Sequence, residues 1–226
     1  LGSSNTYLYS VTFYDDKGRP IQVQSTNMSG GMDVLTTQYS WAGQALVTVE
    51  KTEIAGTNSQ VHTIITKMQY DDLGRLLDVK KTVNSVIGGT AVNKPEQLIV
   101  SNQYDELGQL KNKKLAPSNG SNGLENLAYE YNIRGWLLGL NRNYAKDGGA
   151  DNYFGFDLGY DKADNNIIRH LTYNNPQYNG NIEGMVWKSK GDAEKRRYDF
   201  SYDAANRVTA ETWTDDGIEE ALLEEE

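Results

Sequence analysis

Adjacent carboxylates are the side chains of this chain with the most evident catalytic potential. We consider four such pairs as catalytic candidates, Asp15-Asp16, Asp71-Asp72, Asp105-Glu106 and Asp215-Asp216. Two carboxyl groups that converge on one substrate can act as general acid and general base when their pKa values differ. Three of the four pairs lie in a recurring turn sequence, where aspartate has a structural task. We therefore expect no catalytic residue and no enzyme activity.

Other candidate ligands are few. His62 and His170 are distant in sequence and fit no metal-ligand spacing. The segments 147–152 and 161–166 gather oxygen ligands that Ca²⁺ could use, but neither matches an EF-hand loop, and turn composition explains both. The chain has no phosphate-binding loop, nucleophile elbow or zinc signature. The sequence thus predicts no bound metal and no cofactor.

Tryptophan offers one binding chemistry, because an exposed indole can stack on the face of a sugar ring. Trp41 lies in a turn and Trp136 lies just after one. The alternative is that both rings pack across neighbouring strands, and we favour this alternative. Trp41 and Trp136 remain the candidate sugar-stacking residues.

Charge and hydropathy exclude two classes of partner. The net charge of -9 over 226 residues opposes binding to the phosphate backbone of nucleic acids, which draws on clustered lysine and arginine. No stretch approaches the ~20 apolar residues of a membrane-spanning helix. The sequence therefore predicts neither a nucleic-acid partner nor a membrane span.

A five-residue pattern recurs along the chain and determines its architecture. Each copy has tyrosine, a short polar residue, two variable positions and a residue type that accepts a positive φ at low cost. The seven copies are Tyr14 to Gly18, Tyr39 to Gly43, Tyr70 to Gly74, Tyr104 to Gly108, Tyr131 to Gly135, Tyr160 to Asp164 and Tyr202 to Asn206. Such recurrence is typical of repeat proteins.

The residue types in each copy predict a tight reversal of the chain. Six of the seven second positions carry an Asp or Asn side chain and the other a serine: Asp15, Ser40, Asp71, Asp105, Asn132, Asp161 and Asp203. These short side chains accept hydrogen bonds from nearby backbone N–H groups and favour a type I turn. A type I turn closed by a left-handed residue is the hairpin with a G1 bulge. Each copy therefore predicts strand, turn and strand.

The segments that flank the turns have the composition and period of strands. Phe154, Phe156, Leu158 and Tyr160 alternate along one segment and share one face. At the start of the chain, the alternation of residues 7–13 breaks at Tyr14, which predicts a bulge or register change there.

Composition indicates what kind of sheet these strands build. The chain has 15 tyrosines but only 4 phenylalanines, 38% hydrophobic residues and a mean hydropathy of -0.66. Amphipathic tyrosine suits a sheet that is wet on at least one face. We therefore expect an all-β fold in which antiparallel strand-turn-strand repeats form a curved or spiralling single-layer sheet.

The repeat resembles that of the YD-repeat, or RHS-repeat, proteins of bacteria, whose unit is similar to Tyr-Asp-x-x-Gly-Arg-Leu. Residues 70–76 fit this unit throughout, and an arginine also follows the turn at Arg19, Arg75 and Arg207. Residues 176–188 are similar to a segment found in such proteins from Bacteroidetes-like bacteria. The resemblance implies a sheet that spirals into a hollow shell around a toxin or effector segment of the same polypeptide. It also implies an extracellular or cell-surface location.

The chain length limits how much of such a shell it could form. Enclosing a cargo of ~100 residues takes roughly 30 strands, whereas this chain accommodates roughly 14 to 16. We therefore expect a partial shell whose partners are the remaining repeats and the carboxyl-terminal toxin or effector segment. Open edge strands favour self-association as well. An extracellular carbohydrate-binding or adhesion module is the alternative function.

Domain organisation follows from the spread of the repeats. They run through most of the chain without a Pro- or Gly-rich linker, which predicts one repeat domain over residues 1–214. Residues 215–226 form an acidic tail rich in helix formers. Because so short a helix is marginal in water, we expect either a short helix or disorder there.

Overall fold

The computed structural model describes residues 7–117, 123–146, 151–161, 173, 175–215 and 218–224, and side chains are described up to residue 211. Strands dominate it: β1 (Ser10–Tyr14), β2 (Pro20–Thr26), β3 (Met32–Tyr39), β4 (Ala45–Ile54), β5 (Gln60–Tyr70), β6 (Leu76–Ile87), β7 (Thr90–Tyr104), β8 (Leu110–Leu115), β9 (Glu125–Tyr131), β10 (Leu137–Leu140), β11 (Phe154–Gly159), β12 (Gly184–Ser189), β13 (Lys195–Tyr202), β14 (Val208–Asp215) and β15 (Ile218–Glu224). A short helix, α1 (Arg142–Ala145), lies between β10 and β11. The predicted all-β, antiparallel fold is confirmed.

The contacts within the chain group into two compact units. Unit 1 comprises residues 1–102 and 115–121, and unit 2 comprises residues 103–114 and 122–226. The sequence did not predict this subdivision.

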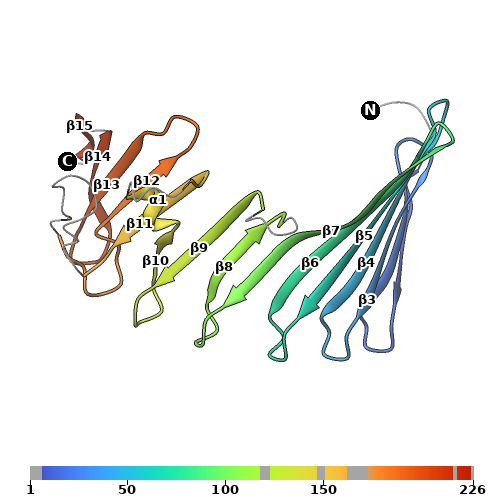
Figure 1. The fold of residues 1–226 in the computed structure, drawn as a ribbon, viewed down its shortest axis with the longest axis horizontal. Coiled ribbons are helices and arrows are strands. Elements are labelled where there is room, and N and C mark those ends of the chain that lie inside the picture. Colours follow the sequence, from blue (N-terminus) through green and yellow to red (C-terminus); the bar gives the residue numbers. More distant parts are fainter. Residues whose placement is uncertain are drawn as a thin grey trace. The chain divides into compact units, whose positions relative to one another are not determined.

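Unit 1 is an antiparallel meander in which each strand pairs with the next one along the chain (Figure 1). The register shifts where three of its strands reach the repeat tyrosine, at Tyr14, Tyr39 and Tyr70. The shift at Tyr14 is the irregularity predicted from the broken alternation of residues 7–13. One residue is left over at each shift, as a bulge requires.

Unit 1 has almost no buried interior. Of its described residues, only Gly31 and Ser85 are buried. Gly31 is required by backbone approach, because a Cβ built there would lie 2.0 Å from the carbonyl oxygen of Glu53. With so little apolar area removed from water, the strands of unit 1 depend on ladder hydrogen bonds and cross-strand side-chain pairs.

Unit 2 has a small core under its strands. Its buried apolar side chains come from α1, β12 and the segments that flank β11: Tyr144, Ala145, Tyr160, Tyr173 and Val186. The side chain of Asn141 positions α1, since its Oδ1 accepts from the Ala128 N–H and its Nδ2 donates to the Phe154 carbonyl, at 2.9 and 2.8 Å. No helix among the described residues has the length and apolar composition to cross a membrane.

The acidic tail differs from its prediction. Residues 218–224 form β15, which pairs antiparallel with β14, rather than a short helix or a disordered end. Without this pairing, the outer backbone groups of β14 would have no ladder partner. Sheet hydrogen bonds therefore prevail over the helix propensity of a segment too short to be helical alone.

Candidate functional site

In three of the repeat turns, both carboxylate oxygens of the aspartate accept hydrogen bonds from within the same turn. Asp15 Oδ1 accepts from the N–H groups of Lys17 and Arg19, both at 2.9 Å, and Oδ2 accepts from Arg19 Nε at 2.6 Å. Asp71 and Asp203 make the same three contacts in their turns. The backbone N–H of Arg19, followed by its side chain, lowers the pKa of the Asp15 carboxyl. Asp15, Asp71 and Asp203, whose pKa values are all lowered by their turn contacts, are thus ionised structural acceptors.

The fifth position of the repeat closes each described turn in the left-handed region. The five glycines and Asn206 there have φ between 62° and 94°: Gly18, Gly43, Gly74, Gly108, Gly135 and Asn206. In the first turn, the Gly18 N–H donates to the Asp15 carbonyl at 3.1 Å, and the Asp15 N–H donates to the Arg19 carbonyl at 3.0 Å. Asp164, the fifth position of the sixth copy, lies outside the described residues.

Five of the repeat tyrosines connect their turn to the preceding hairpin. Their hydroxyls donate to a backbone carbonyl at the first residue of an earlier strand or, for Ile182, two residues before it: Tyr39 to Pro20 (3.1 Å), Tyr70 to Ala45 (3.0 Å), Tyr131 to Leu110 (3.2 Å), Tyr160 to Leu137 (3.0 Å) and Tyr202 to Ile182 (2.8 Å). We call this contact the tyrosine clamp. In the first four cases, the acceptor lies six residues after the tyrosine of the preceding copy.

Burial raises the pKa of three of the clamp hydroxyls. Desolvation raises the pKa of Tyr131, Tyr160 and Tyr202 above the ordinary value of 10. The hydroxyls of these three tyrosines are therefore protonated donors at neutral pH. The clamp therefore joins two copies of the repeat, since the hydroxyl comes from one copy and the carbonyl from another.

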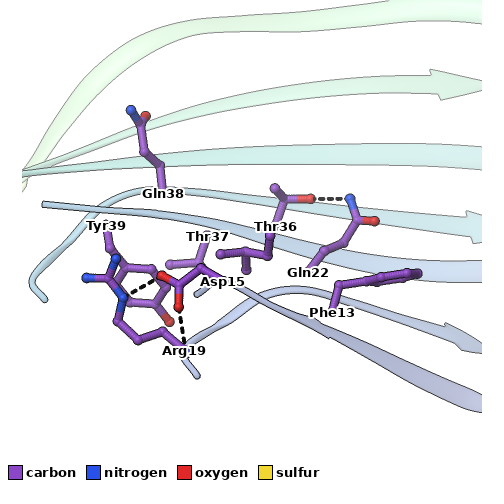
Figure 2. Close-up of a pocket in the computed structure, with 9 residues that line it drawn as sticks. Phe13, Asp15, Arg19, Gln22, Thr36, Thr37, Gln38 and Tyr39 are labelled. Carbon is purple, nitrogen blue, oxygen red and sulfur yellow. Dashed lines mark hydrogen bonds and ion pairs between the residues drawn. The ribbon is translucent and has the colours of Figure 1, made fainter. Parts of the chain in front are cut away.

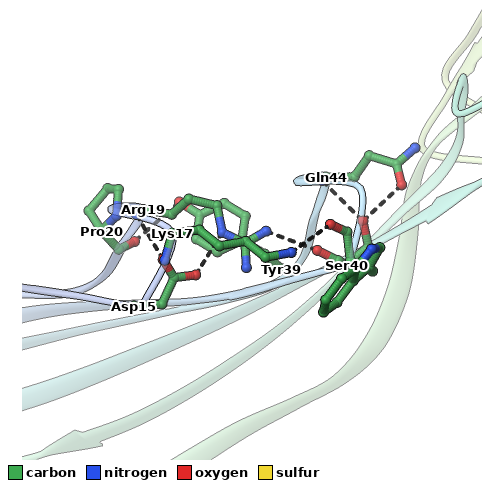
Figure 3. A network of polar contacts seen from close by, with 8 residues as sticks. Asp15, Lys17, Arg19, Pro20, Tyr39, Ser40 and Gln44 are labelled. Atoms are coloured by element: carbon green, nitrogen blue, oxygen red, sulfur yellow. Dashed lines mark hydrogen bonds and ion pairs between the residues drawn. The ribbon is translucent and has the colours of Figure 1, made fainter.

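Charged side chains add further contacts between the first two turns (Figure 3). Arg19 Nη1 donates to the Ser40 carbonyl at 3.0 Å, and its guanidinium lies 4.8 Å from the centre of the Tyr39 ring. Lys17 Nζ donates to the Trp41 carbonyl at 3.3 Å and lies 3.4 Å from the centre of its indole ring. The arginine of the Gly-Arg motif thus contacts the next turn as well as its own aspartate.

An open pocket of about 630 Å³ lies on the strands of these two turns (Figure 2). Its lining comes from β1, β2, β3 and the first turn: Phe13, Asp15, Arg19, Ile21, Gln22, Thr36, Thr37, Gln38 and Tyr39. The charged groups of this lining, Asp15 and Arg19, form an ion pair with each other. The pocket therefore presents no acid and base poised for catalysis.

The remaining chemical candidates do not come together. The carboxylates of Asp15, Asp71 and Asp105 each accept N–H groups of a separate turn. His62 contacts Ser85 Oγ and Gln60 Oε1, both at 2.9 Å. Among the described residues, no group of carboxylates and histidines could hold a metal ion. Asp216, His170 and most of the two proposed calcium segments lie outside the described residues.

The two candidate sugar-stacking tryptophans have different surroundings. Trp41 is 88% exposed, with Lys17 against its ring. Trp136 is half-buried, and its ring centre lies 5.2 Å from that of Tyr160 and 5.0 Å from the Arg134 guanidinium. Trp136 thus packs against a repeat tyrosine, whereas Trp41 presents an accessible aromatic surface.

Sequence reasoning missed a buried polar cluster in unit 2. The ring of Tyr173, 1% exposed, covers a pair of cross-strand glycines, Gly159 and Gly184, where added Cβ atoms would come within 2.3 Å of the ring. The Arg197 guanidinium lies 5.1 Å from the ring centre. Glycine at the facing ends of two paired strands, the last residue of β11 and the first of β12, is a signal of close approach that could have indicated this packing.

Glu183 is the unusual member of this cluster. It is 1% exposed, and neither of its carboxylate oxygens has a hydrogen-bond partner in the described structure. Burial, followed by repulsion from Asp199 and Asp161, raises its pKa from 4.5 to about 7, against the attraction of Arg197. This carboxyl is therefore largely protonated below neutral pH.

An ion-pair group lies beside α1 in the same unit. Asp157, 1% exposed, pairs with Arg142 and with Lys146, whose Nζ lies 3.3 Å from Asp157 Oδ1. Arg142 also contacts Glu130 at 2.7 Å. Through these two ion pairs, Asp157 of β11 holds both Arg142 of α1 and Lys146, which directly follows α1.

Comparison with known proteins gives only distant structural likenesses. No protein-family model and no curated protein sequence matches the chain. A structure described as TcdB2-TccC3 without its hypervariable C-terminal region aligns with 92% of this chain at 12% identity and a TM-score of 0.27, and the chain spans 15% of its length. A porin-like protein from Bacteroides uniformis aligns with 95% of this chain and 91% of its own, at 14% identity and a TM-score of 0.21. Neither likeness assigns a function to this chain.

Proposed function

We propose that this chain is a structural, non-enzymatic part of a β-strand wall of the kind expected from its resemblance to YD- or RHS-repeat proteins. The observation that carries the proposal is the tyrosine clamp, which five copies of the repeat use to bind the hairpin before them. Contacts limited to neighbouring hairpins are what a growing, repetitive sheet needs.

The chemistry of the turns supports this role. In the first two repeats, Asp15, Arg19 and Tyr39 are engaged with backbone or with another repeat residue. A wall that encloses another segment requires such internally satisfied side chains and no exposed catalytic group. The small interior of unit 1 suits a layer with a second partner on one face.

The proposed partners are the remaining repeats and a carboxyl-terminal toxin or effector segment of the same polypeptide, in a secreted or cell-surface protein. This part of the proposal rests on the sequence resemblance. The wall would contain this segment or present it to its target.

Protease protection tests containment directly. The full native reading frame should be expressed in parent form and with Tyr39→Phe, Tyr70→Phe and Tyr131→Phe together. We expect the segment beyond the repeats to resist digestion in the parent and to be cut faster when the clamps are removed, as followed by mass spectrometry. Tyr178→Phe, at an exposed tyrosine without a clamp, is the matched control. Equal digestion of this segment with and without the repeats would refute containment.

Carbohydrate binding is a second candidate, favoured by the 88% exposure of Trp41. A glycan array with the parent and a Trp41→Ala variant tests it, with circular dichroism as the folding control. Binding that Trp41→Ala abolishes would support the sugar site. No binding by a folded parent would eliminate it.

A further inference from the structure

The outer edge of β1 has an unused tyrosine clamp. Tyr14 opens the first repeat, yet its side chain is 60% exposed and its hydroxyl has no hydrogen-bond partner among the described residues. Within these residues, β1 pairs on one side only, with β2. Five later repeat tyrosines donate their hydroxyl to a carbonyl of an earlier hairpin, and Tyr14 has no such hairpin before it in the described chain.

The β1 edge also lacks the features that normally prevent strand addition. Residues 1–14 contain no charged residue and no proline, whereas edge strands are commonly protected by lysine, proline or an inward-pointing charge. Along this segment, Tyr7, Tyr9, Val11 and Phe13 alternate and are 70%, 65%, 52% and 45% exposed. A segment without charged side chains that also exposes apolar side chains is suited to pair with an added strand.

We propose that the β1 edge binds an antiparallel strand that directly follows a Tyr-Asp-x-x-Gly turn of another repeat, and that the first carbonyl of this strand accepts the Tyr14 hydroxyl. The arginine of the incoming turn would lie over the Tyr14 ring, as Arg19 lies over Tyr39 at 4.8 Å. The inference rests on the proposed wall for the source of the strand. The unpaired edge, the lack of charged residues and the available Tyr14 hydroxyl are observations on β1 itself.

The second repeat supplies the geometry for a test. Met32–Tyr39 forms β3, which pairs with β2 so that Thr26 faces Met32, and Tyr39 donates to the Pro20 carbonyl. The segment from Tyr7 to Tyr14 has the same length as β3, eight residues. A second copy of residues 7–31 inserted directly before Tyr7 therefore places a duplicated Pro20 carbonyl where Tyr14 can reach it.

A double-mutant cycle on this extended chain measures the new clamp. We expect Tyr14→Phe to leave the unfolding equilibrium constant of the parent unchanged. In the extended chain, the same substitution should raise this constant roughly five-fold, as for one lost hydrogen bond. Tyr39→Phe in the parent gives the reference value for an occupied clamp. Tyr178→Phe should change neither chain.

Hydrogen exchange provides a second readout. The amides of residues 8–13 should exchange more slowly in the extended chain than in the parent. Equal exchange, or an equal effect of Tyr14→Phe in both chains, overturns the proposal. Because this cycle needs no cargo, failure of the protease-protection experiment leaves its outcome unaffected, and the two hypotheses can fail separately.

Discussion

Glu183 should make the stability of unit 2 depend on pH. Its carboxyl is 1% exposed, and its pKa is raised from 4.5 to about 7, mainly by burial and then by the neighbouring Asp199 and Asp161. Between these two values, the folded chain retains a proton that the unfolded chain releases. The group therefore favours folding most at low pH, and this advantage declines as pH rises from about 4.5 to about 7.

The size of the effect follows from the shift. At about 1.4 kcal/mol per pH unit, the full shift corresponds to about 3 kcal/mol of lost stability. Urea denaturation at a series of pH values, followed by tryptophan fluorescence, should show this decline in the parent. Glu183→Gln keeps the shape of the protonated side chain and cannot ionise, so the decline should largely disappear and the variant should be the more stable chain at pH 8.

A matched control separates Glu183 from the many other carboxylates. Glu106 is exposed in a turn of the same unit, and Glu106→Gln should leave the pH profile of the parent unchanged. The reasoning is refuted if parent and Glu183→Gln lose stability in parallel between pH 5 and 8. Such a result would mean that Glu183 reaches a partner or solvent when it ionises.

Three further predictions concern the repeats. Gly18→Ala should destabilise the chain by about 1–2 kcal/mol, because φ is 74° and no atom lies within 4 Å of an added Cβ, so the cost is purely backbone. Gly18→Asn should cost less, since Asn206 adopts φ of 62° in its own turn, and urea denaturation that ranks the two variants equally would contradict this. Tyr160→Phe should cost about 1 kcal/mol by leaving the Leu137 carbonyl without its donor, whereas Tyr153→Phe, 53% exposed, should be silent in the same assay. Arg19→Lys should raise the pKa of Asp15 in an NMR titration by removing the Nε contact, and an unchanged Asp15 pKa would show that backbone N–H groups alone set it.

The turns were predictable because their chemistry is local. Asp15 and Gly18 act on atoms within four residues, so the side-chain type at each position almost determines the conformation. The bulge at Tyr14 was also readable, since it interrupts a period of two.

The contacts between repeats were not predictable in the same way. The tyrosine hydroxyl reaches a backbone carbonyl, as from Tyr70 to Ala45, and a carbonyl leaves no trace in the residue type. The cover that Tyr173 forms over Gly159 and Gly184 joins segments whose proximity depends on the whole of unit 2. The tail became β15 because of an open neighbour, β14, rather than through its own propensity.

The tyrosine clamp has a consequence for how such chains change length over evolution. The hairpin of β3 and β4 contributes a donor in one direction, the Tyr39 hydroxyl, and an acceptor in the other, the Ala45 carbonyl. Gain or loss of one complete hairpin of this kind conserves the match between donors and acceptors, whereas loss of a single strand leaves either one donor or one acceptor without its partner. Homologous chains should therefore differ by even numbers of strands, with insertions and deletions that begin and end at equivalent points of the motif.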